Sequence, residues 1–224
     1  MQGKNPIRPP ASGDGNTLEV KHIFATLQGE GPYAGHPAVF VRLGGCNLAC
    51  SFCDTDFEGF APMELAAILS RVKYVADEAG KRVRHLVVIT GGEPLRQNIA
   101  PLCEMLLAAG FKVQIETNGT LFRPLPPDVA IVCSPKNTGS GYFPLREDLL
   151  ARLQALKFII SKHNALYRHV GAVGQEQYGT PVYVQPMDEY DAQRNADNLA
   201  YATDIAMQHG YILSLQTHKM LGIE

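Results

Sequence analysis

The sequence predicts an α/β fold in which parallel strands are joined by helices. Two observations carry this prediction: short apolar runs with little polar alternation recur along the chain, and segments with helical apolar spacing lie between them. Such repetition is typical either of an open, doubly wound sheet or of part of a barrel. In both architectures the ligand site lies beyond the carboxyl ends of the strands. The residues that follow each predicted strand are therefore the candidate site.

Seven runs rich in β-branched and aromatic residues are predicted to be strands. They span residues 37–43, 86–90, 111–117, 129–133, 157–161, 182–185 and 211–216. Few polar residues interrupt them, as expected for strands that are covered on both faces.

Three helices are predicted from their apolar spacing and their end signals, at residues 62–79, 98–109 and 191–209. In the first, Pro62 suits the first turn and Gly80 suits the stop. The third can be capped by Asp191 and stopped by Gly210. A shorter amphipathic segment, residues 145–154, is a fourth candidate.

Length and composition predict one domain, since 224 residues with 46% apolar content can form a single core. Residues 1–17 are rich in Gly, Pro, Asn and Ser, so we expect a flexible leader followed by one domain at 18–224. The balance of 20 basic and 22 acidic residues provides no broad positive field, so neither nucleic acid nor a membrane surface is an expected partner. No apolar run reaches the roughly 20 residues that cross a bilayer, and no secretory signal is evident, so we expect a cytoplasmic protein.

Three cysteines, Cys46, Cys50 and Cys53, form a CxxxCxxC run directly after the strand predicted at 37–43. Three thiolates on one short loop can bind three irons of a 4Fe-4S cluster and leave the fourth iron open to a ligand. The alternative is a zinc site, but structural zinc requires four closed ligands, commonly in two such pairs, and no second pair is present. Cys103 and Cys133 are interpreted as small buried apolar residues.

A second motif, Gly91-Gly92-Glu93-Pro94, also follows a predicted strand. Two glycines let the backbone approach a ligand closely, and the Glu93 carboxylate can bind an ammonium or hydroxyl group. The same four residues can also form a simple tight turn.

CxxxCxxC followed by GGEP resembles the radical S-adenosylmethionine superfamily. This resemblance implies a partial, TIM-like barrel and a 4Fe-4S cluster whose open iron binds S-adenosylmethionine. It also implies that the reduced cluster cleaves S-adenosylmethionine to a 5′-deoxyadenosyl radical, which abstracts a hydrogen from the substrate.

From about Val20 onward the sequence resembles, more narrowly, the 7-carboxy-7-deazaguanine synthase family. The motifs that carry this resemblance are LQGEG (27–31), FVRL (40–43), CDT (53–55), ETNGT (116–120), SPK (134–136), QPMD (185–188) and QTHK (216–219). This resemblance implies a carbon–nitrogen lyase that contracts the ring of 6-carboxy-5,6,7,8-tetrahydropterin to 7-carboxy-7-deazaguanine, with release of ammonia, in the biosynthesis of queuosine and other 7-deazapurines. It also implies Mg²⁺, a homodimer and a reducing electron-transfer protein as partner.

The same resemblance assigns site residues. It places S-adenosylmethionine contacts at Phe52, Cys53, Asp54, Gly92, Glu93, Glu116, Ser134, Pro135, Lys136, Gln185, Pro186, Met187 and Asp188. It places substrate contacts at Leu27, Gln28, Gly29, Glu30, Arg42, Thr90, His218 and Glu224. It assigns Mg²⁺ to Thr55. Lys157 is given no role.

These residue types suit such a ligand. A pterin has a guanidine-like N–H edge that a carboxylate accepts in two parallel hydrogen bonds, and Glu30 or the adjacent backbone is the candidate acceptor. The substrate carboxylate needs a cation, for which Arg42, His218 and Mg²⁺ are the candidates. By charge alone, Asp54 and Asp56 would be the Mg²⁺ ligands, and the same stretch can also be a local turn.

Two other functions remain open from the residues alone. One is a radical-generating activase that acts on a glycine of a partner protein. The other is a non-catalytic zinc or partner-binding module, which leaves GGEP, ETNG and QTHK unexplained.

Overall fold

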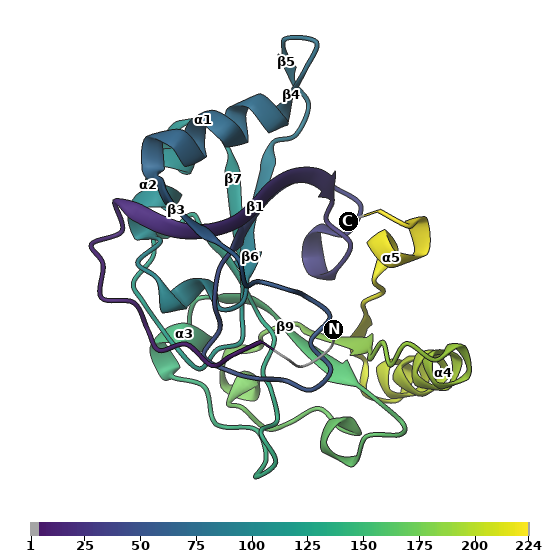
Figure 1. The fold of residues 1–224 in the computed structure, drawn as a ribbon. Helices are drawn as coiled ribbons and strands as arrows, with labels where there is room; N and C mark the ends of the chain where they lie inside the picture. The colour runs from purple at the N-terminus through teal and green to yellow at the C-terminus, as the bar shows by residue number, and fades with distance from the viewer. Residues whose placement is uncertain (1–4, 224) are drawn as a thin grey trace.

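The computed structural model describes residues 5–223, which form a curved nine-stranded sheet with helices on its outer face (Figure 1). The strand order is β11-β10-β9-β8-β7-β6-β2-β1-β3. Seven neighbouring strands are parallel: β2 (Pro37–Leu43), β6 (Leu86–Gly91), β7 (Lys112–Thr117), β8 (Ala130–Cys133), β9 (Leu153–Ile160), β10 (Val182–Pro186) and β11 (Ile212–Leu213). β1 (Thr17–Leu27) pairs antiparallel with β2, and β3 (Ala61–Glu64) pairs antiparallel with β1. Within the described residues β3 and β11 are edges, so the barrel is incomplete.

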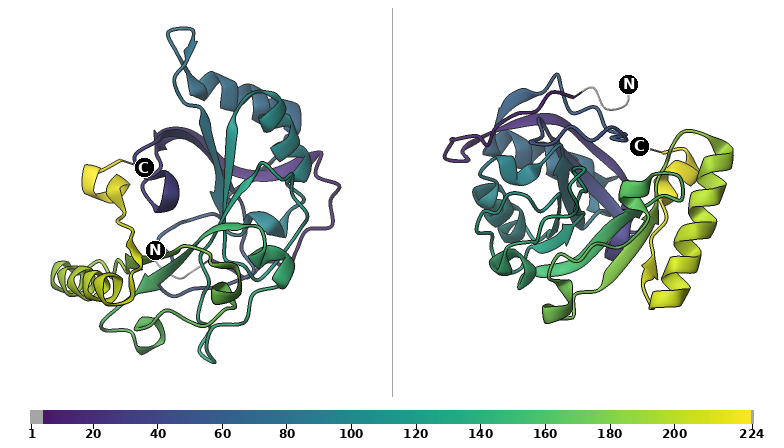
Figure 2. Two further views of the ribbon diagram at one scale, coloured as in Figure 1. Left: turned by 180° about the vertical axis from the view of Figure 1, so that it is seen from behind. Right: turned by 90° about the horizontal axis from the view of Figure 1, so that it is seen from below.

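Two apolar clusters hold the helices against the sheet. The larger one lies between β1, β2, β6 and β7 and the helices α1 (Leu65–Ala76) and α2 (Ala100–Ala108). The smaller one joins Phe158, Ile160 and Val184 of β9 and β10 to Ala202, Ile205 and Ala206 of α4 (Ala192–His209). These helices cover the outer face of the sheet (Figure 2).

All seven predicted strands are present: β2 has the predicted bounds, and the other six have shifted bounds. β9 begins at Leu153, earlier than predicted, and residues 155–158 within it are buried. This extension shortens the helix predicted at 145–154 to α3 (Glu147–Leu150). Only Ile212 and Leu213 of the strand predicted at 211–216 pair with β10. Gln216 directly precedes a short helix that was not predicted, α5 (Thr217–Leu221), and its side chain makes no capping hydrogen bond.

The helix predicted at 62–79 is shorter at both ends. Pro62 lies in β3, where it faces Glu19 of β1, and the helix begins at Leu65. A proline has no N–H for the ladder, so its place in an edge strand is acceptable. The helix ends at Ala76, and Gly80, with φ of 76°, lies in the turn between β4 (Asp77–Glu78) and β5 (Lys81–Arg82). By contrast, the cap at Asp191 and the stop at Gly210 are confirmed for α4.

The first part of the segment expected to be a leader, residues 1–4, lies outside the described residues. Ile7 forms a parallel bridge with Cys46, and the Arg8 N–H donates to the Cys46 carbonyl at 2.7 Å. Further along, the Ala11 N–H donates to the Arg96 carbonyl at 2.7 Å. Residues 5–14, here called the N-terminal strap, therefore run over the loop that carries the three cysteines.

None of the helices in the described residues is long and apolar enough to cross a membrane.

Candidate active site

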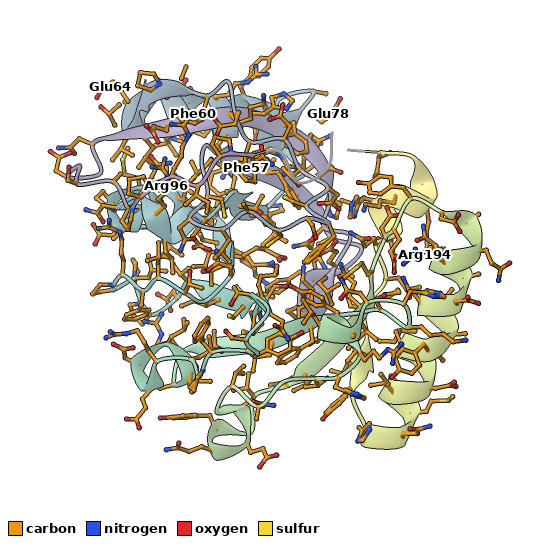
Figure 3. The ribbon with its side chains drawn as sticks, turned by 60° about the horizontal axis from the view of Figure 1, so that its bottom comes forward. Phe57, Phe60, Glu64, Glu78, Arg96 and Arg194 are labelled. Carbon is orange, nitrogen blue, oxygen red and sulfur yellow. The ribbon has the colours of Figure 1, made fainter. Side chains whose placement is uncertain are left out.

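A cavity of about 270 Å³ lies at the carboxyl ends of the parallel strands. Most of the predicted site residues line it: Leu27, Gln28, Glu30, Arg42, Cys46, Cys50, Phe52, Cys53, Asp54, Thr55, Thr90, Gly92, Glu116, Ser134, Lys136, Gln185, Pro186, Met187, Asp188 and His218. Gly29, Glu93 and Pro135 do not line it, and Glu224 lies outside the described residues. Phe57, which is labelled in Figure 3, also lines the cavity. Arg194 of α4, labelled in the same figure, does not. The cavity thus lies where the predicted strand ends indicated it would.

The three cysteines of the CxxxCxxC loop all face this cavity. Burial raises the pKa of Cys46 to about 11 and raises the pKa of both other thiols. Among residues 5–223 no three His, Cys, Asp or Glu side chains are grouped to hold a single metal ion. A 4Fe-4S cluster does not need such a group, because each thiolate binds a different iron. The donor set therefore fits the cluster.

The two glycines of GGEP are required where the backbones after β2 and β6 touch. A Cβ on Gly91 would lie 2.1 Å from the Leu43 carbonyl oxygen, and one on Gly92 would lie 2.0 Å from that of Gly45. Gly91 also has φ of 135°, which L residues rarely adopt. This close approach seats the GGEP turn directly against the start of the cysteine loop.

Glu93 is buried and does not itself line the cavity. Its side chain is fully buried, and one carboxylate oxygen accepts from the Leu95 N–H at 2.9 Å and the Thr117 hydroxyl at 2.8 Å. The other accepts from the Asn118 N–H at 2.7 Å. Burial raises the pKa of this carboxyl. The carboxylate therefore holds the ends of β6 and β7 together through these three donors. The expectation that it also meets a ligand stays a prediction.

Lys136 provides positive charge beside the cysteine loop. Its buried ammonium donates to the Ser134 carbonyl and hydroxyl oxygens, both at 2.6 Å. Burial lowers its pKa, and the nearby Cys50 sulfur opposes that effect. Any anionic group held by the cysteines would therefore lie close to a compensating cation.

Asp54 and Asp188 are bridged on the cavity wall by Lys219 of α5. Its ammonium contacts Asp54 Oδ2 at 2.7 Å and Asp188 Oδ2 at 2.9 Å. Burial acts to raise the pKa of Asp188, but the hydrogen bonds from Lys219, the Tyr190 N–H and Asn195 together outweigh it, and the pKa is lowered. Thr55, the expected Mg²⁺ ligand, donates to Asp54 Oδ1 at 3.2 Å and accepts from Arg42 at 3.3 Å. Its hydroxyl oxygen and the adjacent carboxylate are the hard donors that Mg²⁺ prefers.

LQGEG and QTHK, which lie far apart in the sequence, meet at one side of the cavity. The Gly29 carbonyl accepts from the Thr217 N–H at 3.1 Å, and the Gly31 N–H donates to the Ser214 hydroxyl at 3.0 Å. The left view in Figure 2 shows α5 beside the turn that follows β1. Burial lowers the pKa of His218, so its ring is held toward the neutral form. Gly29 does not line the cavity; because it has no side chain, His218 can pack closely against its backbone.

Lys157 of β9 lines the cavity, although the sequence analysis gave it no role. Its ammonium forms ion pairs with Glu30, and with Glu116 at 2.8 Å, while only 4% of its side chain is exposed. Gln216, also unassigned, donates to Glu30 Oε1 at 2.8 Å. A signal was present, because lysine is almost never fully buried unless it is paired, and Lys157 interrupts an apolar strand.

The N-terminal strap also reaches the cavity. Asn5 lines it and donates from Nδ2 to the Thr55 carbonyl at 2.9 Å. Arg8 makes a two-pronged contact with Glu58, at 2.9 Å from Nε and 2.5 Å from Nη2. The Arg8 guanidinium also lies 5.1 Å from the centre of the Phe60 ring. The strap therefore holds the cysteine loop at its start, through Cys46, and at its end, through Thr55 and Glu58.

Comparison with known proteins gives a consistent result over the whole chain. The Radical SAM superfamily matches residues 40–135. The 7-carboxy-7-deazaguanine synthase of Rickettsia prowazekii (strain Madrid E) is 54% identical over 225 residues, which cover 100% of this chain and 96% of the relative. The protein of the same name from Rhodospirillum rubrum is 44% identical, with 100% of both chains covered.

The fold has a relative among solved structures, the crystal structure of QueE from Escherichia coli. The TM-score is 0.72 at 24% sequence identity, with 92% of this chain and 99% of that chain covered. This likeness confirms an α/β architecture of the same kind. Given the full-length identity to the two relatives above and the cysteine-lined cavity at the strand ends, the chain belongs to the 7-carboxy-7-deazaguanine synthase family of radical S-adenosylmethionine proteins.

Proposed function

We propose that this protein converts 6-carboxy-5,6,7,8-tetrahydropterin to 7-carboxy-7-deazaguanine with release of ammonia, as a carbon–nitrogen lyase of queuosine biosynthesis. The observation that carries the proposal is the single cavity in which the three cysteine thiols, Glu30 of LQGEG and His218 of QTHK meet. The relatives that share the full length of the chain have the corresponding name.

Cys46, Cys50 and Cys53 would hold the 4Fe-4S cluster. S-adenosylmethionine would lie against a set of strand-end residues: Phe52, Asp54, Gly92, Glu116, Ser134, Lys136, Gln185, Pro186, Met187 and Asp188. When bound, the cluster and S-adenosylmethionine supply the radical that removes a hydrogen atom from the substrate. The protein's own residues bind the pterin, orient it and limit access of water.

Substrate recognition is divided between acceptors and cations. Glu30 would accept from the N–H edge of the pterin, and Arg42 would face its carboxylate. Burial acts to raise the pKa of Glu30, but the Lys157 ammonium and the Gln216 amide outweigh it, and the pKa is about 2. Glu30 is therefore ionised at neutral pH and remains a hydrogen-bond acceptor.

The proposal has further parts that rest on family membership. Thr55 would bind Mg²⁺, the protein would act as a cytoplasmic homodimer, and a reducing electron-transfer protein would provide the electron. From composition rather than family membership, the chain would comprise a leader at 1–17, which includes the N-terminal strap and the first residue of β1, and one radical S-adenosylmethionine domain at 18–224.

The test is an anaerobic assay of reconstituted protein with S-adenosylmethionine, a reductant, Mg²⁺ and the tetrahydropterin, followed by mass spectrometry. We expect 7-carboxy-7-deazaguanine from wild type and from Cys103→Ala, whose buried thiol lies outside the cavity, and none from Cys50→Ala. Cleavage of S-adenosylmethionine with intact pterin would leave the radical chemistry and reject the substrate. Binding of zinc alone, without an iron cluster, would reject the enzyme.

A further inference from the structure

The Lys157 ammonium joins carboxylates from two distant parts of the chain. Glu30 comes from the turn after β1, Glu116 from β7 and Lys157 from β9. The Glu30 and Glu116 side chains are only 17% and 16% exposed. Two anions and one cation therefore lie together in a part of the cavity wall with little solvent exposure, where an unpaired charge is costly.

The two carboxylates differ in how many acceptor positions they have left. Glu116 accepts from Lys157, from Gln28 at 3.1 Å and from Gln114 at 2.8 Å. Among the described residues, Glu30 accepts from Lys157 and from Gln216, one donor on each oxygen. A carboxylate offers about four lone-pair positions, so each Glu30 oxygen keeps one for a ligand. Glu116 is instead nearly saturated by protein donors and serves as the anchor.

The Lys157 bridge determines what Glu30 presents to a ligand. Without the ammonium, burial would favour a neutral carboxyl on one of the two acids. A neutral carboxyl would present an O–H donor to the N–H edge of a pterin, where an acceptor is required. The lysine also fixes Glu30 in place against the sheet, through Glu116.

We propose that Lys157 is a positioning and specificity-determining residue, which holds Glu30 as a two-oxygen acceptor and so selects a ligand with adjacent N–H donors over one with a carbonyl at that edge. This inference rests on the proposed function, since it concerns recognition of the pterin ring. Lys157 acts through Glu30 and is not required to touch the substrate.

The experiment measures equilibrium binding to the reconstituted, unreduced protein under anaerobic conditions. Two ligands are compared: the tetrahydropterin, and the analogue with a second ring carbonyl in place of the exocyclic amino group. The variants are Lys157→Met and Lys157→Arg, with Lys162→Met as the matched control, because Lys162 lies on the exposed surface just after β9.

For wild type and Lys162→Met we expect clear preference for the amino-bearing ligand. For Lys157→Met we expect its affinity to fall by at least about tenfold, the typical cost of a lost charged hydrogen bond, with the preference reduced toward unity. Lys157→Arg keeps the charge and should restore part of the preference. In turnover, Lys157→Met should raise KM more than it lowers kcat.

Equal weakening of both ligands by Lys157→Met, or unchanged affinity and preference, would overturn the inference and leave the proposed function standing. Absence of tetrahydropterin binding by wild type would overturn the proposed function and this inference with it. If Lys157→Met does not fold, the double variant Lys157→Met/Glu116→Gln is used in its place and is compared with the single variant Glu116→Gln. The double variant removes one buried anion together with the cation, so no extra charge is left unpaired. The same loss of preference is expected between those two variants.

Discussion

A Cβ added to Gly29 would lie 2.1 Å from Nδ1 of His218, so the imidazole occupies the space that any other side chain at position 29 would need. Gly29→Ala should therefore displace His218 from the cavity. We expect kcat/KM to fall by roughly 10- to 100-fold, as displaced active-site groups often cause. The measurement is steady-state kinetics with the tetrahydropterin.

Gly13→Ala is the matched control, since nothing lies within 4 Å of an added Cβ there. A methyl group at position 13 should leave both activity and stability unchanged. If Gly29→Ala retains wild-type kinetics, the placement of His218 is not important for turnover.

The main effect of Glu93→Gln should be a loss of stability. The amide replaces an oxygen that faces protein donors with an NH₂ group, so at least one of the Leu95, Thr117 and Asn118 contacts is lost. We expect a loss of about 1 to 3 kcal/mol in the free energy of unfolding in urea. Glu104→Gln, on the exposed face of α2, should change it little. Equal stability of the two variants would contradict the positioning role of Glu93.

Arg8→Gln should weaken the attachment of the N-terminal strap to the cysteine loop. The variant loses both prongs of the contact with Glu58. Iron should then be removed several times faster by a chelator, followed through the visible absorbance of the cluster. Arg146→Gln removes a similar two-pronged pair, with Asp148, on the surface. It should leave the rate unchanged, and identical rates for both variants would show that the strap does not protect the cluster.

Acid should remove the contribution of Glu30 to stability. Its pKa is about 2 in the folded protein, below the ordinary 4.5, so the folded state favours the ionised form. That contribution is complete above pH 4.5 and is lost as the pH falls toward 2. Between pH 5 and pH 3, the free energy of unfolding of wild type should fall by on the order of 2 kcal/mol more than that of Glu30→Gln. Parallel urea-unfolding curves across this range would contradict the ionised state.

Local sequence patterns were sufficient for the parallel strands and for α4, because apolar runs and caps act over a few residues. They were insufficient for β1, whose pattern of buried and exposed residues depends on β2 and β3 on either side. The site shows the same division. Motifs that follow strands could be placed at the cavity, whereas Lys157 and Glu30 are 127 positions apart in the sequence, and only the completed sheet brings them together.

The contact between Thr217 and Gly29 joins residues 188 positions apart, which has a consequence for the order of folding. Closing so large a loop is entropically costly, and the ends meet at low cost only after the intervening strands have formed. During synthesis, β1 through β9 leave the ribosome before Gln216 and His218 are added to the chain. We therefore expect the cavity wall to be completed last, so that a nascent chain can build its sheet while it still lacks a competent site.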